Sequence, residues 1–367
     1  MRTAYRTIRP LLFSLPAETA HGAVHRGLNA IQHTAIEDRL RDRLVVDDDR
    51  LAVEAFGQSF SNPVGVAAGF DKNAELPAIL GALGFGHVEV GGVTARAQPG
   101  NPRPRMFRLV EDRAIVNRMG LNNEGAEAVG ERLRTSPDPG IPVGVNVALS
   151  EATDADDAPE DYRYTYERVA DVAEQGSAAC RTSSGTVADY LAVNVSCPNS
   201  EGMRELQNRD ALEAILGELV DAGASPLLVK LSPDLPGPAI EDALAVVDDF
   251  DLDGVIATNT TTDRPSGLKS PNRAETGGLS GKPIEARATE MVRFVAERTD
   301  VPVVGVGGVS DAAGAYAKIR AGASLVQLYT GLVYEGPTLA RDINEGLLEL
   351  LEEDGFESVE DAVGADL

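Results

Sequence analysis

Short apolar runs and longer amphipathic segments alternate along most of this chain. The runs are three to five residues long and rich in β-branched residues, which is typical of buried strands. The segments between them repeat apolar residues every three or four positions, as one face of a helix does. We predict strands at 64–67, 88–90, 143–147, 191–195, 227–231, 254–257, 303–306 and 325–329, and helices at about 74–84, 122–134, 161–175, 208–222, 238–249, 284–299, 311–321 and 338–352.

This alternation predicts the fold class. Strands that alternate with helices are expected to be parallel, and eight such pairs are the number that closes a (β/α)8 TIM barrel. An open, doubly wound sheet is the alternative, but no Gly-x-Gly-x-x-Gly turn follows the first strand. We therefore predict an α/β protein whose main domain, residues 46–367, is a TIM barrel.

Three segments depart from the alternation of strands and helices. Residues 51–60 alternate weakly around Gly57 and predict a small hairpin that leads into the barrel. Residues 105–120 hold two apolar runs separated by Glu111-Asp112-Arg113, which is typical of a hairpin inserted after the second strand. Residues 176–186 are small and polar and predict a surface loop, in which we assign Cys180 no role.

Residues 1–45 are predicted to form a separate helical extension. A first amphipathic segment ends at Pro16, and a second spans 17–32. The apolar part is too short and too interrupted for a signal peptide. Such a helical pair can lie on a membrane, or it can pack as a cap on the barrel. His21 and His25 lie one turn apart, but no third ligand is near, so we predict no metal site.

Composition narrows the classes of function. The formal charge of −25 makes nucleic acid an unfavourable partner, and such acidity resembles that of proteins from salt-loving organisms, where salt screens the self-repulsion. No uncharged apolar run of 18 residues is present, so no spanning helix is predicted. The only cysteines, Cys180 and Cys197, provide no disulfide framework, which suits a reducing, cytoplasmic compartment.

The fourth predicted strand carries the most informative chemistry. Asn194 lies inside its apolar run, and Ser196-Cys197-Pro198-Asn199 follow. In a parallel barrel this end of the strands is where active sites are built. A lone cysteine is most often a small buried hydrophobe. The alternative is that Cys197 is a catalytic base or nucleophile flanked by amides. Lys230 lies between Val229 and Leu231 inside an apolar strand, which fits poorly with an ordinary exposed lysine.

The other strand ends are also polar or glycine-rich. They carry Ala68, Gly69 and Lys72; Gly92; Asn117, Arg118, Met119, Gly120 and Leu121 after the hairpin; Asn146; Thr258, Asn259 and Thr260; Gly308; and Tyr329 and Thr330. Glycine-rich ends on the seventh and eighth strands form a phosphate site in many barrels. The set predicts a pocket for a phosphorylated cofactor and a flat, hydrogen-bonding substrate.

Several motifs together are similar to those of the dihydroorotate dehydrogenase family, over nearly the whole chain. They are Ala67-Ala68-Gly69-Phe70-Asp71-Lys72, Pro99-Gly100-Asn101-Pro102-Arg103-Pro104-Arg105, Asn117-Arg118-Met119-Gly120, Ile256-Ala257-Thr258-Asn259-Thr260-Thr261, Thr276-Gly277-Gly278-Leu279-Ser280-Gly281 and Val304-Gly305-Val306-Gly307-Gly308. The N-terminal segment with Glu18-Thr19-Ala20-His21 resembles the extension of the quinone-reducing class 2, which forms the quinone tunnel and rests on the membrane.

The resemblance implies an activity and a set of roles. The family oxidises dihydroorotate to orotate in pyrimidine synthesis: a base removes a proton from C5 while a hydride passes from C6 to flavin N5. Cys197 takes the position of the base. The implied substrate-binding residues are Lys72, Asn117, Arg118, Met119, Gly120, Leu121, Asn194, Asn199, Asn259 and Thr260. The implied FMN-binding residues are Ala68, Gly69, Lys72, Gly92, Asn146, Asn194, Lys230, Thr258, Gly281, Gly308, Tyr329 and Thr330. His21, Arg108 and Tyr329 would line the quinone path. We expect a monomer bound peripherally to the cytoplasmic side of the membrane.

Two residues depart from the class 2 pattern. Class 2 members usually have serine as the base, whereas Cys197 is as in the soluble class 1 enzymes, and Gly92 stands where the family usually has threonine or serine. The alternatives are a soluble class 1-like enzyme that uses fumarate or a partner flavoprotein, a phosphate-binding barrel isomerase or lyase without redox chemistry, and an inactive barrel that serves as a binding module. The N-terminal extension favours class 2.

Overall fold

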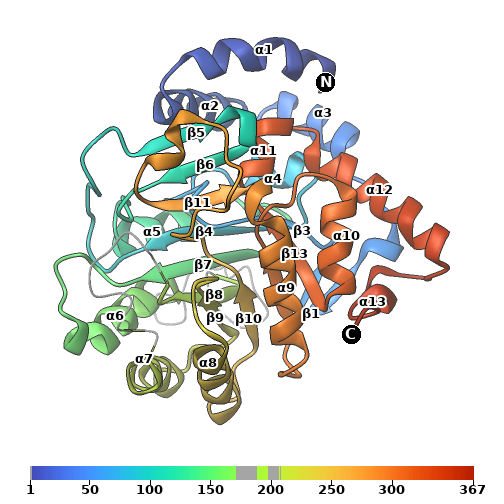
Figure 1. Cartoon of the computed structure of the whole chain (residues 1–367). Coiled ribbons are helices and arrows are strands. Elements are labelled where there is room, and N and C mark those ends of the chain that lie inside the picture. Colours follow the sequence, from blue (N-terminus) through green and yellow to red (C-terminus); the bar gives the residue numbers. More distant parts are fainter. Residues whose placement is uncertain (1, 171–187, 197–205, 207) are drawn as a thin grey trace.

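The computed structural model describes residues 2–170, 188–196, 206 and 208–367. Eight parallel strands close into a barrel in the order β3, β4, β7, β8, β9, β10, β12, β13 (Figure 1). Their bounds are β3 Val64–Val66, β4 His87–Val93, β7 Val143–Ala148, β8 Tyr190–Asn194, β9 Leu227–Leu231, β10 Gly254–Ala257, β12 Val303–Val306 and β13 Ala323–Leu328. The predicted TIM barrel is confirmed.

Helices surround the barrel, as the amphipathic segments predict. They are α4 Pro77–Ala82, α5 Ala126–Thr135, α6 Ala158–Ala170, α7 Arg209–Asp221, α8 Gly237–Asp249, α9 Glu285–Ala296, α10 Ala312–Arg320 and α12 Leu339–Asp354, with short α11 Thr330–Glu335 and α13 Val359–Ala362. The 3-10 turns are η1 Asp49–Leu51, η2 Val110–Asp112, η3 Ala155–Asp157, η5 Pro271–Ala274 and η6 Lys282–Ile284. Helix α4 starts later than predicted because Pro77 suits the first helical turn.

Aromatic side chains fill the floor of the barrel. The imidazole of His87 lies against Gly65, where an added Cβ would be 2.1 Å from Nε2, and Tyr190 occupies the equivalent space beside Gly144. Phe60 packs edge-on against His87 at a centroid distance of 5.3 Å. The floor is therefore closed, and any ligand must enter from the opposite, C-terminal end of the strands.

Both predicted hairpins are present. Strands β1 (Val53–Ala55) and β2 (Gln58–Phe60) pair antiparallel, as do β5 (Met106–Leu109) and β6 (Ala114–Asn117). A third strand, β11 (Gly278–Gly281), joins β6 and was not predicted, because its Gly-Leu-Ser-Gly sequence shows no apolar alternation. The predicted loop at 176–186 lies outside the described residues.

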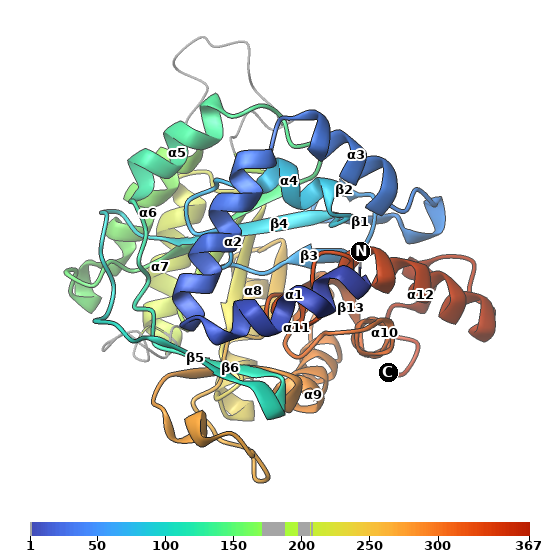
Figure 2. The ribbon, with the colours of Figure 1, turned by 90° about the horizontal axis from the view of Figure 1, so that it is seen from above.

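The N-terminal extension contains three helices, α1 (Arg2–Ser14), α2 (Ala17–Ile31) and α3 (Ala35–Leu44), whereas the sequence indicated two. Thr34 caps α3, and its hydroxyl accepts a hydrogen bond from the Ile36 amide. Helices α1 and α2 lie across one end of the barrel, beside β5 and β6 (Figures 1 and 2). Within the described part of the chain, no helix is both long and apolar enough to cross a bilayer.

Candidate functional site

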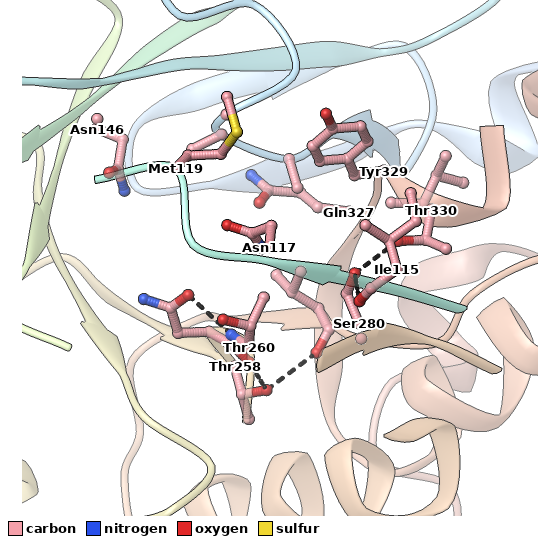
Figure 3. Close-up of a pocket in the computed structure, with 18 of the residues that line it drawn as sticks. Ile115, Asn117, Met119, Asn146, Thr258, Thr260, Ser280, Gln327, Tyr329 and Thr330 are labelled. Carbon is pink, nitrogen blue, oxygen red and sulfur yellow. Dashed lines mark hydrogen bonds between the residues drawn. The ribbon is translucent and has the colours of Figure 1, made fainter. Parts of the chain in front are cut away.

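A polar cavity opens at the C-terminal ends of the barrel strands, and all eight strands or the loops that follow them contribute to its wall. It brings together most of the residues singled out from the sequence (Figure 3): Ala68, Gly69, Lys72, Gly92, Asn117, Met119, Gly120, Leu121, Asn146, Asn194, Lys230, Thr258, Asn259, Thr260, Gly281, Gly308, Tyr329 and Thr330. Residues that are separated by more than 250 positions in the chain thus face one space.

Among the described members of the predicted substrate set, Arg118 alone does not line the cavity. Its guanidinium pairs with Glu275 at 2.8 Å and lies over the ring of Phe107, 4.4 Å from the centroid. Neighbouring side chains of an extended segment point in opposite directions, so Asn117 and Met119 face the cavity while Arg118 turns away. Cys197 and Asn199 lie outside the described residues.

Three asparagines, on β7, on β8 and just after β10, are linked side chain to side chain. Asn194 Nδ2 donates to Asn146 Oδ1 at 3.1 Å, and Asn259 Nδ2 donates to Asn194 Oδ1 at 3.2 Å. The hydroxyl of Ser196 also accepts from Asn259 Nδ2, at 2.9 Å. A polar amide buried in a strand is unfavourable unless it is bonded, and here each amide satisfies the next. Their side chains are held in place before any ligand binds.

Lys230 ends in a buried ion pair that the sequence analysis missed. Its ammonium lies 2.9 Å from Glu89 Oε1, and the Glu89 side chain is fully buried in β4. Asn146 and Gln327 donate to the same carboxylate, each at 2.9 Å. The signal was present, because Glu89 lies between Val88 and Val90 just as Lys230 lies between Val229 and Leu231. One buried charge in an apolar strand indicates a partner on another strand.

One end of the cavity is shaped to hold an anion. Gly281 and Gly308 both have positive φ angles, of 100° and 79°. A Cβ on Gly308 would lie 2.4 Å from Glu285 Cβ, so only glycine lets the backbone here pack against the start of α9. The hydroxyls of Ser280 and Thr330 are 2.8 Å apart in the same wall (Figure 3). Glycine-rich backbone and hydroxyl donors of this kind suit a phosphate.

Gly92 is one of the two residues at which the sequence departs from the class 2 pattern that the resemblance implies. A Cβ there would come within 3.0 Å of Leu121 Cδ2 and 3.2 Å of Asn146 Oδ1. Leu121 therefore occupies the space that a larger residue at position 92 would need. With glycine at this position, Leu121 and Asn146 beside it complete this part of the cavity wall.

Lys72 supplies a second cation at the cavity. Its ammonium donates to the carbonyl oxygen of Gly69 at 2.7 Å. Burial lowers the pKa of Lys72 to about 8, with a further lowering from Arg105, while Asp71 and Glu18 oppose the shift. Lys72 is therefore mainly charged at neutral pH and titrates in an accessible range.

A second, apolar cavity of about 270 Å³ lies between helices α1 and α2 and the barrel. It is lined by Tyr5, Leu12, Phe13, Ala17, Ala20, His21, Val24, Leu28, Phe70, Leu83, Met106, Arg108, Ile115, Tyr329, Leu332, Val333, Gly336 and Pro337. The three residues predicted for the quinone path, His21, Arg108 and Tyr329, are all among them. Met106, Ile115 and Tyr329 line both cavities, so only one layer of side chains separates the two.

The few polar groups of the apolar cavity are kept uncharged or tied to backbone. Burial, together with Lys72 and His25, lowers the pKa of His21 to about 3, so its imidazole is neutral. Burial raises the pKa of Tyr329 well above its ordinary value. Arg108 donates to the carbonyl oxygens of Leu12, at 3.1 Å, and Leu15, which fastens the end of α1 to β5.

Metal binding has no support in the described part of the chain, where no three His, Cys, Asp or Glu side chains cluster. His25 instead lies 3.5 Å from Glu75. The structure thus has one polar and one apolar cavity that share a thin wall. Any function proposed for the protein must account for both.

Comparison with known proteins identifies the family of this chain. The model of the dihydroorotate dehydrogenase family matches residues 50–351. The chain belongs to this family. A relative from Haloarcula marismortui named dihydroorotate dehydrogenase (quinone) is 67% identical over 363 residues, 99% of both chains, and one of the same name from Natronomonas pharaonis is 64% identical over 99% of both chains. The relatives come from halophilic archaea, which agrees with the acidic composition.

Solved structures of other dihydroorotate dehydrogenases have the same fold. The crystal structure of the enzyme from Eimeria tenella in complex with ferulenol matches with a TM-score of 0.83 and 34% identity, covering 97% of this chain and 98% of that one. The ligand-free enzyme from the same organism matches with a TM-score of 0.79. The match to the first includes the N-terminal helices, since it extends over nearly the whole chain.

Proposed function

We propose that this protein is a quinone-dependent dihydroorotate dehydrogenase. It oxidises dihydroorotate to orotate in pyrimidine biosynthesis and passes the electrons to a membrane quinone. The observation that carries the proposal is the pair of cavities that share Met106, Ile115 and Tyr329. A polar ring substrate suits the first, and an apolar quinone suits the second. A class 1-like enzyme that uses fumarate would leave the apolar cavity without a role.

We infer that the polar cavity holds a flavin, FMN. The positive-φ glycines Gly281 and Gly308 and the hydroxyls of Ser280 and Thr330 line the same end of the cavity and suit its phosphate. Lys230 presents a cation to the cavity, and the buried Gln327 Oε1 has no hydrogen-bond partner among the described residues. The residues that would hold the flavin are Ala68, Gly69, Lys72, Gly92, Asn146, Asn194, Lys230, Thr258, Gly281, Gly308, Tyr329 and Thr330. When bound, the flavin would accept a hydride from the substrate and later release two electrons to the quinone.

The substrate would lie against the asparagine side of the cavity. Asn117, Asn194 and Asn259 offer amide donors and acceptors, which suit a ring whose edge alternates both. The charged Lys72 suits the substrate carboxylate. By resemblance to the family, Cys197 is the base that takes the proton from C5, and Asn199 assists binding.

We propose that α1 and α2 rest on the cytoplasmic surface of the membrane. Ile8 and Leu11 of α1 are 51% and 70% exposed, and Leu15 and Val24 are also exposed. Apolar side chains gathered on two adjacent helices are typical of a surface that meets lipid. A quinone could then move from the bilayer into the apolar cavity without crossing water.

The test is a pair of half-reactions on purified protein. Denaturation should release about one FMN per chain, because each chain has one barrel mouth. Without oxygen, dihydroorotate should bleach the flavin, and a soluble quinone should restore its colour faster than fumarate does. A folded protein without flavin, or one reoxidised by fumarate alone, would contradict the proposal.

A further inference from the structure

Glu89 lies one layer below the polar cavity and does not line it. Its carboxylate accepts three hydrogen bonds, from Lys230 and Asn146 at Oε1 and from Gln327 at Oε2, each at 2.9 Å. All three donors do line the cavity. Glu89 therefore contacts the ligand space only through these three side chains.

The carboxylate sets the direction of the amides around it. An ionised carboxylate can only accept hydrogen bonds, whereas an amide side chain can point either way. Asn146 must turn its NH2 group towards Glu89, which leaves its Oδ1 to accept from Asn194. The Asn194 Oδ1 is then free to accept from Asn259. The order of donors and acceptors from β4 to β10 thus begins at Glu89.

The same constraint acts on Gln327. Its NH2 group is directed at Glu89 Oε2, so its buried Oε1 has no hydrogen-bond partner within the described residues and is left for a donor in the cavity. Lys230 gives one N–H to Glu89 and keeps two for a ligand. The cavity therefore presents an acceptor and a cation side by side. The pyrimidine edge of a flavin, an N–H flanked by two carbonyl groups, has the complementary pattern.

We propose that Glu89 is a positioning residue for the flavin: it anchors the Lys230 ammonium at the cavity and orients Gln327 and the asparagine chain. This inference rests on the proposed function, because it requires a flavin in the polar cavity. Glu89 itself touches neither the flavin nor the substrate. Its influence is carried by Lys230, which would stabilise the negative charge of the reduced flavin.

The direction in which the flavin midpoint potential changes when Glu89 is removed separates this positioning role from a direct effect of the Glu89 charge. A bare negative charge below the flavin would disfavour its reduction, so removal of Glu89 alone would raise the midpoint potential. If Glu89 acts through Lys230, its removal leaves a buried ammonium without a counter-ion, which is strongly unfavourable. The cation is then lost from the cavity or displaced, and the midpoint potential falls.

The experiment is a redox titration of bound flavin in native protein and in Glu89→Gln, Lys230→Met and the double variant. Glu89→Gln should lower the equilibrium constant for two-electron reduction about tenfold, which is about 30 mV. Lys230→Met should lower it at least as much, and the double variant should match Lys230→Met because the two residues form one unit. A potential that rises or stays unchanged in Glu89→Gln, or effects that add in the double variant, would overturn the proposal.

Two further variants keep the test decisive. Glu89→Asp keeps the charge but shortens the side chain, so it should lower the potential by less, and it decides the matter if Glu89→Gln does not fold. Lys318→Met removes another fully buried lysine, one that lines neither cavity and donates to Thr289 at 2.8 Å. Its flavin potential should stay native. Native protein that holds no flavin would refute the proposed function before any variant is compared.

Discussion

The polar and apolar cavities share Tyr329, Met106 and Ile115, yet they are built in opposite ways. The polar cavity is formed by the ends of buried strands, and its side chains are fixed by hydrogen bonds such as those joining Asn146, Asn194 and Asn259. The apolar cavity lies between two surface helices and the barrel, and both contribute to its lining. Its shape depends on side-chain packing, with few directional contacts.

This difference indicates that the polar cavity, which is rigid, and the apolar cavity, which is adaptable, serve different half-reactions. A ring substrate must be held in a single orientation for proton and hydride removal, and oriented amides provide that. A quinone needs mainly an apolar passage from the bilayer to the wall at Tyr329. Damage to one cavity should therefore impair one half-reaction and spare the other.

The largest effect is expected from Cys197→Ala. If Cys197 is the base, reduction of the flavin by dihydroorotate should slow by roughly two to four orders of magnitude, the usual contribution of a positioned base. Orotate should still bind nearly normally, because the amides hold it. Stopped-flow bleaching of the flavin measures the rate, and reoxidation by quinone is the internal control. A native rate in this variant would mean that Cys197 only packs.

The apolar cavity should respond to a change in volume. Ala20 is buried and lines it, so Ala20→Phe would fill space that the quinone needs. We expect reoxidation by quinone to slow by roughly tenfold or more, by analogy with steric discrimination in apolar pockets, with flavin reduction unchanged. Ala23→Phe on the exposed face of the same helix is the matched control. Equal slowing in both variants would show that the helix, not the cavity, was disturbed.

The pH dependence of orotate binding should report on Lys72. Its pKa is lowered to about 8, so the ammonium loses its proton as the pH rises through that value. Affinity for the orotate anion should therefore be constant below about pH 7 and fall above pH 8, by at most about tenfold per pH unit. Calorimetric titrations from pH 6 to pH 9 give the profile. Lys72→Met should bind weakly at every pH, and a dependence that persists in this variant would exclude Lys72 as its source.

The smallest effect is expected at Arg118. The family resemblance includes it in the substrate set, but the structure holds its guanidinium on Glu275 and Phe107. Arg118→Ala should change the dissociation constant of orotate by less than about threefold, a difference below 1 kcal/mol. Asn117→Ala, one residue earlier and facing the cavity, should weaken binding clearly more. The reverse order would mean that Arg118 turns inward when substrate binds.

The sequence predicted the barrel and the polar cavity well, for a physical reason. The strands of a parallel barrel are buried on both faces and form continuous apolar runs, so Lys230 and Asn194 stand out as polar interruptions. The same signal at Glu89 was overlooked, because a single acidic residue among valines does not reveal which strand carries its partner. Strand β11 was not predicted because its Gly-Leu-Ser-Gly sequence shows no alternation of apolar and polar residues.

The apolar cavity could not be predicted from residue patterns alone. Ala20 and Leu28 look like the ordinary inner face of an amphipathic helix, whether they cover a core or a passage. Only the resemblance to class 2 enzymes suggested a quinone path at His21, Arg108 and Tyr329. The direction of Arg118 was likewise not predicted: the alternation of side chains turns it away from Asn117 and Met119, and its partner Glu275 lies more than 150 residues away in the chain.

Measurement of both half-reactions in two variants tests most directly whether each cavity serves one half-reaction. Asn259→Ala removes a directional contact from the polar cavity, and Ala20→Phe fills the apolar one. In an anaerobic stopped-flow experiment, Asn259→Ala should need roughly tenfold more dihydroorotate for the same rate of flavin reduction, the cost of one lost hydrogen bond, and should be reoxidised by quinone at the native rate. Ala20→Phe should show the opposite pattern. If both variants slow the same half-reaction, the two cavities do not divide the reaction between them.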